Sequence, residues 1–161
     1  MDPVCDERAD CRWTSNHWWS SYDELREETQ VVASVRVRGS GGIAVLRNRQ
    51  YTLKRFRWPP YVTLHDLETA KLVARLSLIP KGGFLAEFND GESFRLGWIN
   101  WWRRDWAWTK KNGETALLSR RPRWWGRDID LWIGPDRGAD GKWPFLAVPE
   151  LAAEKVPLPL F

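Results

Sequence analysis

A chain of 161 residues with 43% hydrophobic and 29% charged residues fits one globular domain, large enough to need neither a disulfide nor a metal for stability. This composition argues against extensive disorder, and the absence of any run of about 18 uninterrupted apolar residues excludes a transmembrane helix. The acidic N-terminus lacks the apolar stretch of a secretory signal, so we expect a cytoplasmic protein, with peripheral attachment to a membrane as an open alternative. The unusual feature is the count of 13 Trp against 3 Tyr and 6 Phe.

Charge is distributed unevenly along the chain. Residues 1–30 hold 8 acidic and 3 basic side chains, whereas residues 31–127 hold 19 basic and 7 acidic ones. The formal net charge of +4 therefore hides a strongly basic middle section. Such a charge excess attracts nucleic acid, anionic lipid or an acidic protein partner.

The first thirty residues are predicted to form an acidic head. Within it, the stretch SSYDELREETQ predicts a short helix, capped by Ser20 or Ser21 and carrying Asp23 and Glu24 in its first turn.

Two cysteines, Cys5 and Cys11, also lie in this head, and without a secretory context we expect both thiols to be reduced. Together with His17 they lack the short Cys-x-x-Cys pairing that is typical of zinc sites. We therefore expect a flexible or loosely docked tail that holds no metal.

Beyond residue 30 the sequence changes to the pattern of β-strands. Val35–Arg38 alternate strictly, and Gly39–Gly42 form a turn before the apolar run IAVL, which predicts a hairpin. From Tyr51 onward, short runs rich in β-branched and aromatic residues follow one another: YVTLHD, LVARLSL, FLAEF, SFRLGW, WAWTK, TALLSRR and IDLWI. Residues 31–161 are therefore predicted to be a single all-β or mainly β domain.

Two kinds of turn alternate between these runs. The acidic turns are Asp66–Thr69, Asn89–Glu92, Lys111–Glu114 and Pro135–Gly141, and the basic, Trp-rich turns are Arg55–Pro60, Pro80–Gly83, Trp101–Asp105 and Arg121–Arg127. Each kind recurs about every 22 residues, so one repeat holds one strand pair. Alternate turns of a meander lie at opposite ends, so the pattern predicts an antiparallel up-and-down barrel with an acidic end and a basic end.

The stretches YVTLHDLETAKLVARL, FLAEFNDGESFRLGW and WAWTKKNGETALLSRR share a cadence of strand, Asp- or Asn-containing turn, strand and basic linker. Over roughly Val31 to Leu151 this cadence resembles the tubby-like C-terminal barrel superfamily, which includes LURP-one-related proteins and phospholipid scramblases. The resemblance implies a closed barrel of about twelve strands around a central apolar helix near the C-terminus. It also implies membrane lipid as a ligand, since several members bind phosphoinositides or other lipids; some members act with DNA.

The chain departs from the superfamily in two respects. Its C-terminal sequence allows only a short helix, from near Pro149 to before Pro157, so a smaller or more open barrel is an alternative. No binding residue of the superfamily can be matched to a position in this chain.

The residues that could carry catalysis are few, and we predict that the protein is not an enzyme and needs no cofactor. His65 borders a turn, where we expect it to bond a nearby backbone group. Asp128 and Asp130 share one face of a strand, where we expect solvation or pairing with arginine rather than a metal or glycosidase site.

The basic, Trp-rich turns remain as the candidate ligand site. Its predicted members are Arg55, Arg57, Trp58, Lys81, Trp101, Trp102, Arg103, Arg104, Arg121, Arg123, Trp124, Trp125 and Arg127. Arginine can hydrogen-bond two phosphate oxygens at once and Trp suits the membrane interface, so we predict a module that binds anionic lipid headgroups.

Other interpretations of the same turns stay open. Trp stacking on unpaired bases would make them a nucleic-acid site, and stacking between Trp and Arg would make them purely structural. Strand alternation assigns Trp98, Trp106, Trp108 and Trp132 to packing. A further alternative is a protein partner that docks on YDELREE or on the tail VPLPLF, unless the tail only covers the end of the barrel.

Overall fold

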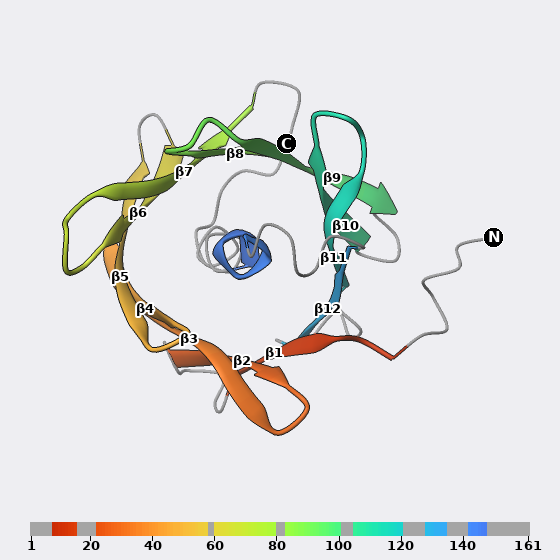
Figure 1. Ribbon diagram of the computed structural model, residues 1–161, viewed down its shortest axis with the longest axis horizontal. Helices are drawn as coiled ribbons and strands as arrows, with labels where there is room; N and C mark the ends of the chain where they lie inside the picture. Colours follow the sequence, from red (N-terminus) through yellow and green to blue (C-terminus); the bar gives the residue numbers. More distant parts are fainter. Residues whose placement is uncertain are drawn as a thin grey trace.

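The computed structural model describes residues 8–15, 22–57, 60–79, 83–100, 105–120, 128–134 and 142–147. The strands are β1 (Cys11–Ser15), β2 (Tyr22–Glu27), β3 (Gln30–Arg38), β4 (Gly41–Leu46), β5 (Arg49–Arg57), β6 (Pro60–Asp66), β7 (Leu72–Leu78), β8 (Phe84–Phe88), β9 (Ser93–Asn100), β10 (Asp105–Lys110), β11 (Thr115–Arg120) and β12 (Ile129–Ile133). Each strand pairs antiparallel with the next in the chain, and β1 pairs with β12, so the sheet closes into a barrel (Figure 1). The predicted antiparallel up-and-down barrel is confirmed.

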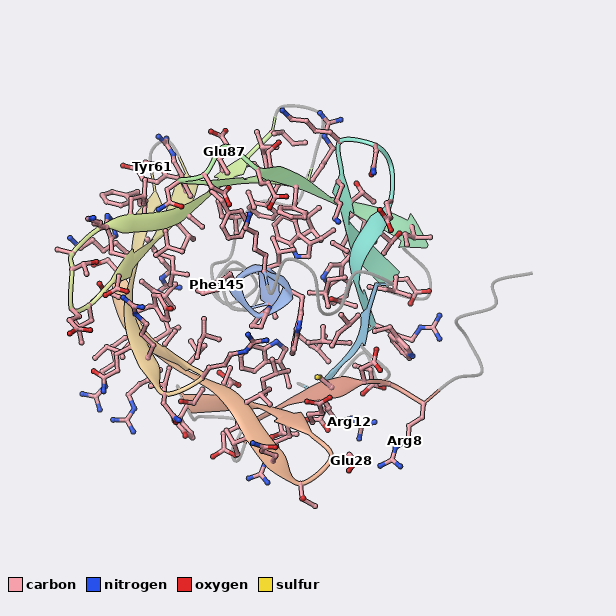
Figure 2. The ribbon with its side chains drawn as sticks, viewed as in Figure 1. Arg8, Arg12, Glu28, Tyr61, Glu87 and Phe145 are labelled. Atoms are coloured by element: carbon pink, nitrogen blue, oxygen red, sulfur yellow. The ribbon has the colours of Figure 1, made fainter. Side chains whose placement is uncertain are left out.

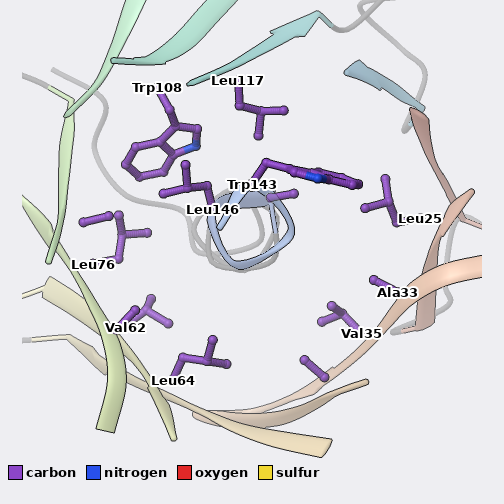
Figure 3. Close-up of a cluster of buried hydrophobic side chains, with 14 of the residues drawn as sticks. Leu25, Ala33, Val35, Val62, Leu64, Leu76, Trp108, Leu117, Trp143 and Leu146 are labelled. Carbon is purple, nitrogen blue, oxygen red and sulfur yellow. The ribbon is translucent and has the colours of Figure 1, made fainter. Parts of the chain in front are cut away.

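Side-chain alternation gives each strand one row that faces the interior and one that faces outward. In β8, for example, Phe84, Ala86 and Phe88 are buried, while Glu87 is exposed. The inward rows of the strands together form one apolar core, part of which is drawn in Figure 3. The barrel is therefore filled by side chains, as expected from the period-two pattern of its sequence.

A short helix at residues 143–147 lies inside the barrel and completes this core (Figures 1 and 3). Trp143 and Leu146 are buried among the inward rows, and the ring of Phe145 packs edge-on against Tyr51 and Phe88 with centroid separations of 5.3 and 6.4 Å (Figure 2). A short helix near the C-terminus is thus present, as predicted, but it lies at residues 143–147. The segment predicted to be helical, from near Pro149 to before Pro157, lies outside the described residues.

Lys142 fastens this helix to the turn between β8 and β9. Its ammonium binds the carboxylates of Asp90 and Glu92 and lies 5.3 Å from the ring centroid of Phe88. Burial lowers the pKa of Lys142, but the hydrogen bonds to the two carboxylates outweigh burial and leave that pKa raised. The hydrogen bond from Lys142 is also the main cause of the lowered pKa of Asp90.

The N-terminal helix predicted for SSYDELREETQ is wrong, because Tyr22–Glu27 form strand β2. Asp23 and Leu25 are buried on one face of β2, as a strand and not a helix requires. Pairing with β1 and β3 fills the backbone hydrogen bonds on both sides, whereas a helix would leave two strands with open edges. The stabilisation from this pairing outweighs the preference of the capping residues for a helix.

Cys11, expected in a loose tail, is buried in strand β1, where it is 2% exposed.

The predicted hairpin around Gly39–Gly42 is present, with Gly41 and Gly42 inside β4 and Gly39 in the turn at a positive φ of 56°. Two of the acidic turns, Asn89–Glu92 and Lys111–Glu114, also share one geometry. The carboxylate of Asp90 accepts from the amide of Glu92 at 2.9 Å, and the amide oxygen of Asn112 accepts from Glu114 at 3.0 Å. The glycine after each, Gly91 or Gly113, supplies the positive φ that the turn needs.

An outer charge ladder crosses the strands at which the barrel closes. Its members are Asp105, Arg120, Asp130 and Arg12, which are successive cross-strand neighbours on β10, β11, β12 and β1. The Asp105 carboxylate accepts from Arg120 Nε at 2.6 Å and from Nη2 at 2.7 Å, and Asp130 accepts from Arg12 Nε at 2.6 Å. The carboxylates of Asp105 and Asp130 are nearly buried, so arginine compensates charges that water does not reach.

Replacing Arg120 with Met should lower the free energy of unfolding by about 2–4 kcal/mol, because Asp105 then loses both bonds to a charged partner. Urea denaturation checks this value. Adding Asp105→Leu to Arg120→Met should restore part of the loss, since the uncompensated charge is gone. The matched control is Arg95→Met, which removes an exposed cation from β9. Equal losses in Arg120→Met and Arg95→Met would contradict a role for the ladder.

Lys142→Met should make the stability of the protein less sensitive to acid. The lowered pKa of Asp90 stabilises the fold above the ordinary carboxylate value of about 3.9, and this contribution disappears as pH falls through the lowered pKa. Without Lys142, the unfolding free energy should fall less between about pH 6 and about pH 3. Urea denaturation at both pH values measures this difference. Lys71→Met removes a lysine that makes no ion pair with the described residues, and it should keep the wild-type pH dependence.

Candidate functional site

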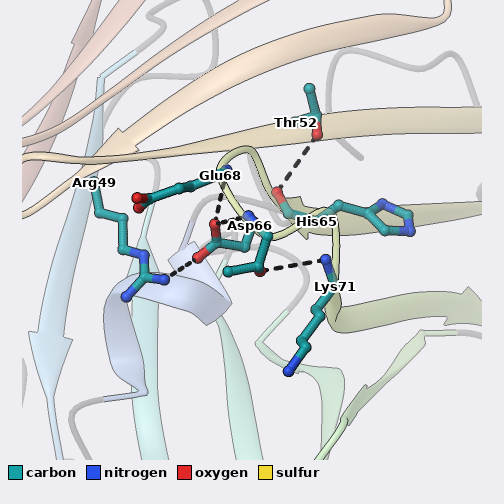
Figure 4. Close-up of polar contacts among 7 residues, drawn as sticks. Arg49, Thr52, His65, Asp66, Glu68 and Lys71 are labelled. Atoms are coloured by element: carbon teal, nitrogen blue, oxygen red, sulfur yellow. Dashed lines mark hydrogen bonds and ion pairs between the residues drawn. The ribbon is translucent and has the colours of Figure 1, made fainter.

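The acidic end of the barrel is occupied by contacts that hold its own turns and the helix. At the turn after β6, the carboxylate of Asp66 accepts from the amides of Thr69 and Glu68 at 3.0 and 2.9 Å (Figure 4). Arg49 binds the other carboxylate oxygen at 2.6 Å. The amides of Thr69 and Glu68, followed by Arg49, lower the pKa of Asp66. The carboxylates of this end therefore serve the fold.

The basic end is the end at which β5 finishes and β6 starts, and where the other Arg- and Trp-rich turns join their strands. Arg55 and Arg57 lie in β5, and only Arg55 has a described side chain. The remaining predicted site residues lie outside the described residues: Trp58, Lys81, Trp101, Trp102, Arg103, Arg104, Arg121, Arg123, Trp124, Trp125 and Arg127. The strand ends that flank these segments all meet at this end of the meander.

The side chain of Arg55 is only partly exposed, within the wall of the barrel. It belongs to the inward row of β5, together with the buried Leu53, and its guanidinium binds the carbonyl oxygen of Gly39 in the β3–β4 turn. The backbone amide of Arg55 also donates to the carbonyl of Ser40 at 2.7 Å. Arg55 thus joins the end of β5 to the β3–β4 turn.

Trp98 departs from the packing role that strand alternation assigned to it. Trp106 and Trp108 are buried as expected, and Trp132 is half-buried under the guanidinium of Arg120. Trp98 lies on the same inward row as Leu96 and faces Trp106 across the strands, but it is 51% exposed. Its ring packs edge-on against Trp106 at a centroid distance of 5.5 Å. The two rings therefore form a continuous aromatic contact from the buried Trp106 to the exposed Trp98 at the basic end.

The exposure of Trp98 follows from strand length. Strand β9 has 8 residues and β8 has 5, and the first residue of β8, Phe84, already pairs with Leu96. Trp98 and Ile99 lie beyond this pairing, and the end of β9 projects from the wall in Figure 1. Ile99, on the opposite face of the strand, is 52% exposed, so two large apolar side chains reach the solvent at the end of β9. The sequence carries no clear signal for this exposure, because the pairing register of β8 and β9 decides which side chains extend past β8.

The other candidate chemical groups are His65, Asp128 and Asp130. Among the described residues, no three His, Cys, Asp or Glu side chains lie close enough together to hold a metal ion. Asp130 pairs with Arg12, as expected, and Asp128 is exposed. The Nδ1 atom of His65 is buried without a hydrogen-bond partner in the described part of the chain, so the backbone bond expected for this ring is not formed there.

Within the described ranges, no helix has the length and apolar character needed to cross a bilayer.

Comparison of this chain with known protein families, with curated proteins and with solved structures finds no match. The resemblance to tubby-like barrels therefore assigns no family to this chain.

Proposed function

We propose that the protein is a non-enzymatic binding module that contacts anionic membrane lipid headgroups through its basic end. The observation that carries this proposal is the exposed pair of Trp98 and Ile99 at the end of β9. In the sequence this pair runs directly into Trp101, Trp102, Arg103 and Arg104. Apolar, aromatic and cationic side chains thus follow one another within seven residues.

Each residue type in this segment has a role at a membrane surface. Trp prefers the boundary between headgroups and acyl chains, because its ring is largely apolar and its indole nitrogen donates a hydrogen bond. Arginine binds headgroup phosphates with two parallel hydrogen bonds. An exposed Ile99 favours lipid over nucleic acid, since an aliphatic side chain gains by entering acyl chains and offers no flat face on which a base can stack.

The tubby-like resemblance supports the same proposal. A twelve-strand barrel around a short internal helix agrees with what that resemblance implies, and several members of the superfamily bind membrane lipids. The basic middle section of the chain adds long-range attraction to an anionic surface.

Trp98→Ala combined with Ile99→Ser should weaken binding to vesicles of phosphatidylcholine and phosphatidylserine about tenfold, because both side chains lose their insertion into the interface. Co-sedimentation with the vesicles measures this binding. Leu67→Ala combined with Leu72→Ala is the matched control, since these leucines are 46% and 41% exposed on the opposite, acidic end. The control should bind as wild type does.

Charge reversal tests the arginines of the same end. Arg103, Arg104, Arg121 and Arg123 changed together to Glu should abolish vesicle binding and leave the circular dichroism spectrum unchanged. The proposal would be refuted if the wild-type protein did not bind anionic vesicles. It would also be refuted if the Trp98/Ile99 variant bound them as strongly as wild type. Binding of a single-stranded oligonucleotide with steep salt dependence, and no binding of vesicles, would identify the alternative ligand class.

A further inference from the structure

The outer wall formed by β5, β6 and β7 differs from the wall at the closure. Around the closure, outward arginines are paired with carboxylates in the outer charge ladder. On β5 and β7, the outward cations Lys54 and Arg75 are exposed, and neither forms an ion pair with any described residue. In this half of the wall, the part of the chain that the structure describes leaves these two cations without an ion pair.

These two cations flank a threonine on the strand between them. Lys54 is the cross-strand partner of Thr63, and Thr63 is the partner of Arg75. All three point outward, because Val62 and Leu64 on either side of Thr63 belong to the core (Figure 3). Directly opposite residues in antiparallel strands have Cα atoms about 4.5–5.5 Å apart, so an ammonium, a hydroxyl and a guanidinium share one small area of the wall.

Thr63 is buried although it faces outward. It is 8% exposed, and its Oγ1 has no hydrogen-bond partner among the described residues. A buried hydroxyl without a partner is unfavourable, so the site lacks a group that could accept its proton. The neighbouring side chains on the same face are the long, exposed Lys54 and Arg75, whose ends can move aside for a ligand.

Arg75 is held at this site by aromatic rings. Its guanidinium carbon lies 4.3 Å from the ring centroid of Tyr61, and Tyr61 in turn stacks on Phe56 with centroids 4.2 Å apart and planes 16° apart. Tyr61 and Glu87 are labelled on the outside of the barrel in Figure 2. Stacking orients the guanidinium without using its hydrogen-bond donors, which stay available for an acceptor.

We propose that Lys54, Thr63 and Arg75 form a binding site for a phosphate monoester. Arg75 donates two hydrogen bonds to phosphate oxygens, Lys54 supplies a mobile positive charge, and the Thr63 hydroxyl donates a third bond to an oxygen seated between them. The negative charge of the ligand complements the two cations, and one of its oxygens accepts a hydrogen bond from the Thr63 hydroxyl. Glu87, the cross-strand neighbour of Arg75 on β8, weakens binding by repelling the phosphate.

This site goes beyond the lipid contact at the basic end. It lies on the side wall, it recognises a phosphate group by hydrogen bonds, and it needs no apolar insertion. Either site can fail without affecting the other.

The test is titration of the ¹⁵N-labelled full chain with glycerol 3-phosphate and with inorganic phosphate, followed by amide NMR shifts. Sodium chloride at equal ionic strength is the reference. We expect saturable shifts centred on residues 54, 63 and 75. Thr63→Val should weaken binding about tenfold without lowering the melting temperature, because it removes a buried hydroxyl that has no partner in the described part of the chain. Glu87→Gln should tighten binding.

Arg75→Gln and Arg95→Gln separate specific binding from net charge, since both remove one exposed cation. Only Arg75→Gln should weaken binding, by about tenfold or more. Shifts equal to those in chloride, or equal losses in both variants, would overturn the site. Phosphatidylcholine vesicles with and without phosphatidic acid then identify the source of the phosphate. A loss on Thr63→Val in the Trp98/Ile99 variant background points to a lipid headgroup, and binding of the soluble ester alone points to a free ligand.

Discussion

The pairing of β1 with β12 is the constraint on which the other features of this structure depend. It places Cys11 against Leu131 and Trp13 against Ile129, so the inward rows of the first and last strands become continuous. A closed sheet has no free edge, and each strand then has one face toward the core and one toward solvent. The pair of Arg12 with Asp130 crosses the same closure from outside, which joins apolar contacts, backbone pairing and charge at one place.

The two ends of the closed barrel differ in their contacts. The helix at residues 143–147 fills the interior and is fastened at the acidic end by Lys142, so the carboxylates of Asp90 and Glu92 are neutralised within the fold. At the basic end, Trp98 and Ile99 extend past the neighbouring strand and stay exposed. The acidic end is thus stabilised by its charges, whereas the other end exposes apolar side chains for which we propose a lipid ligand.

The outer wall of the barrel is also divided into two regions, which differ in whether their cations are paired with carboxylates. Where strands close the barrel, each arginine of the ladder meets a carboxylate, and the charges contribute to stability. On β5 and β7, Lys54 and Arg75 form no ion pair with a described residue, and the hydroxyl of Thr63 between them has no described hydrogen-bond partner. We propose that these two cations, next to a buried hydroxyl without a described partner, make this part of the wall a binding surface.

The sequence by itself determined the features that depend on near neighbours. Short runs of β-branched and aromatic residues predicted strands at β3, β4 and β6 to β12, and the Asp-Gly and Asn-Gly turns at Asp90 and Asn112 form through side chain to backbone bonds only two residues long. Tertiary structure alone decided that Tyr22–Glu27 is a strand, that Trp98 is exposed, and that Lys54, Thr63 and Arg75 are adjacent. These outcomes depend on strand register, unequal strand lengths and closure, and such contacts between distant residues leave no periodic signal in the sequence.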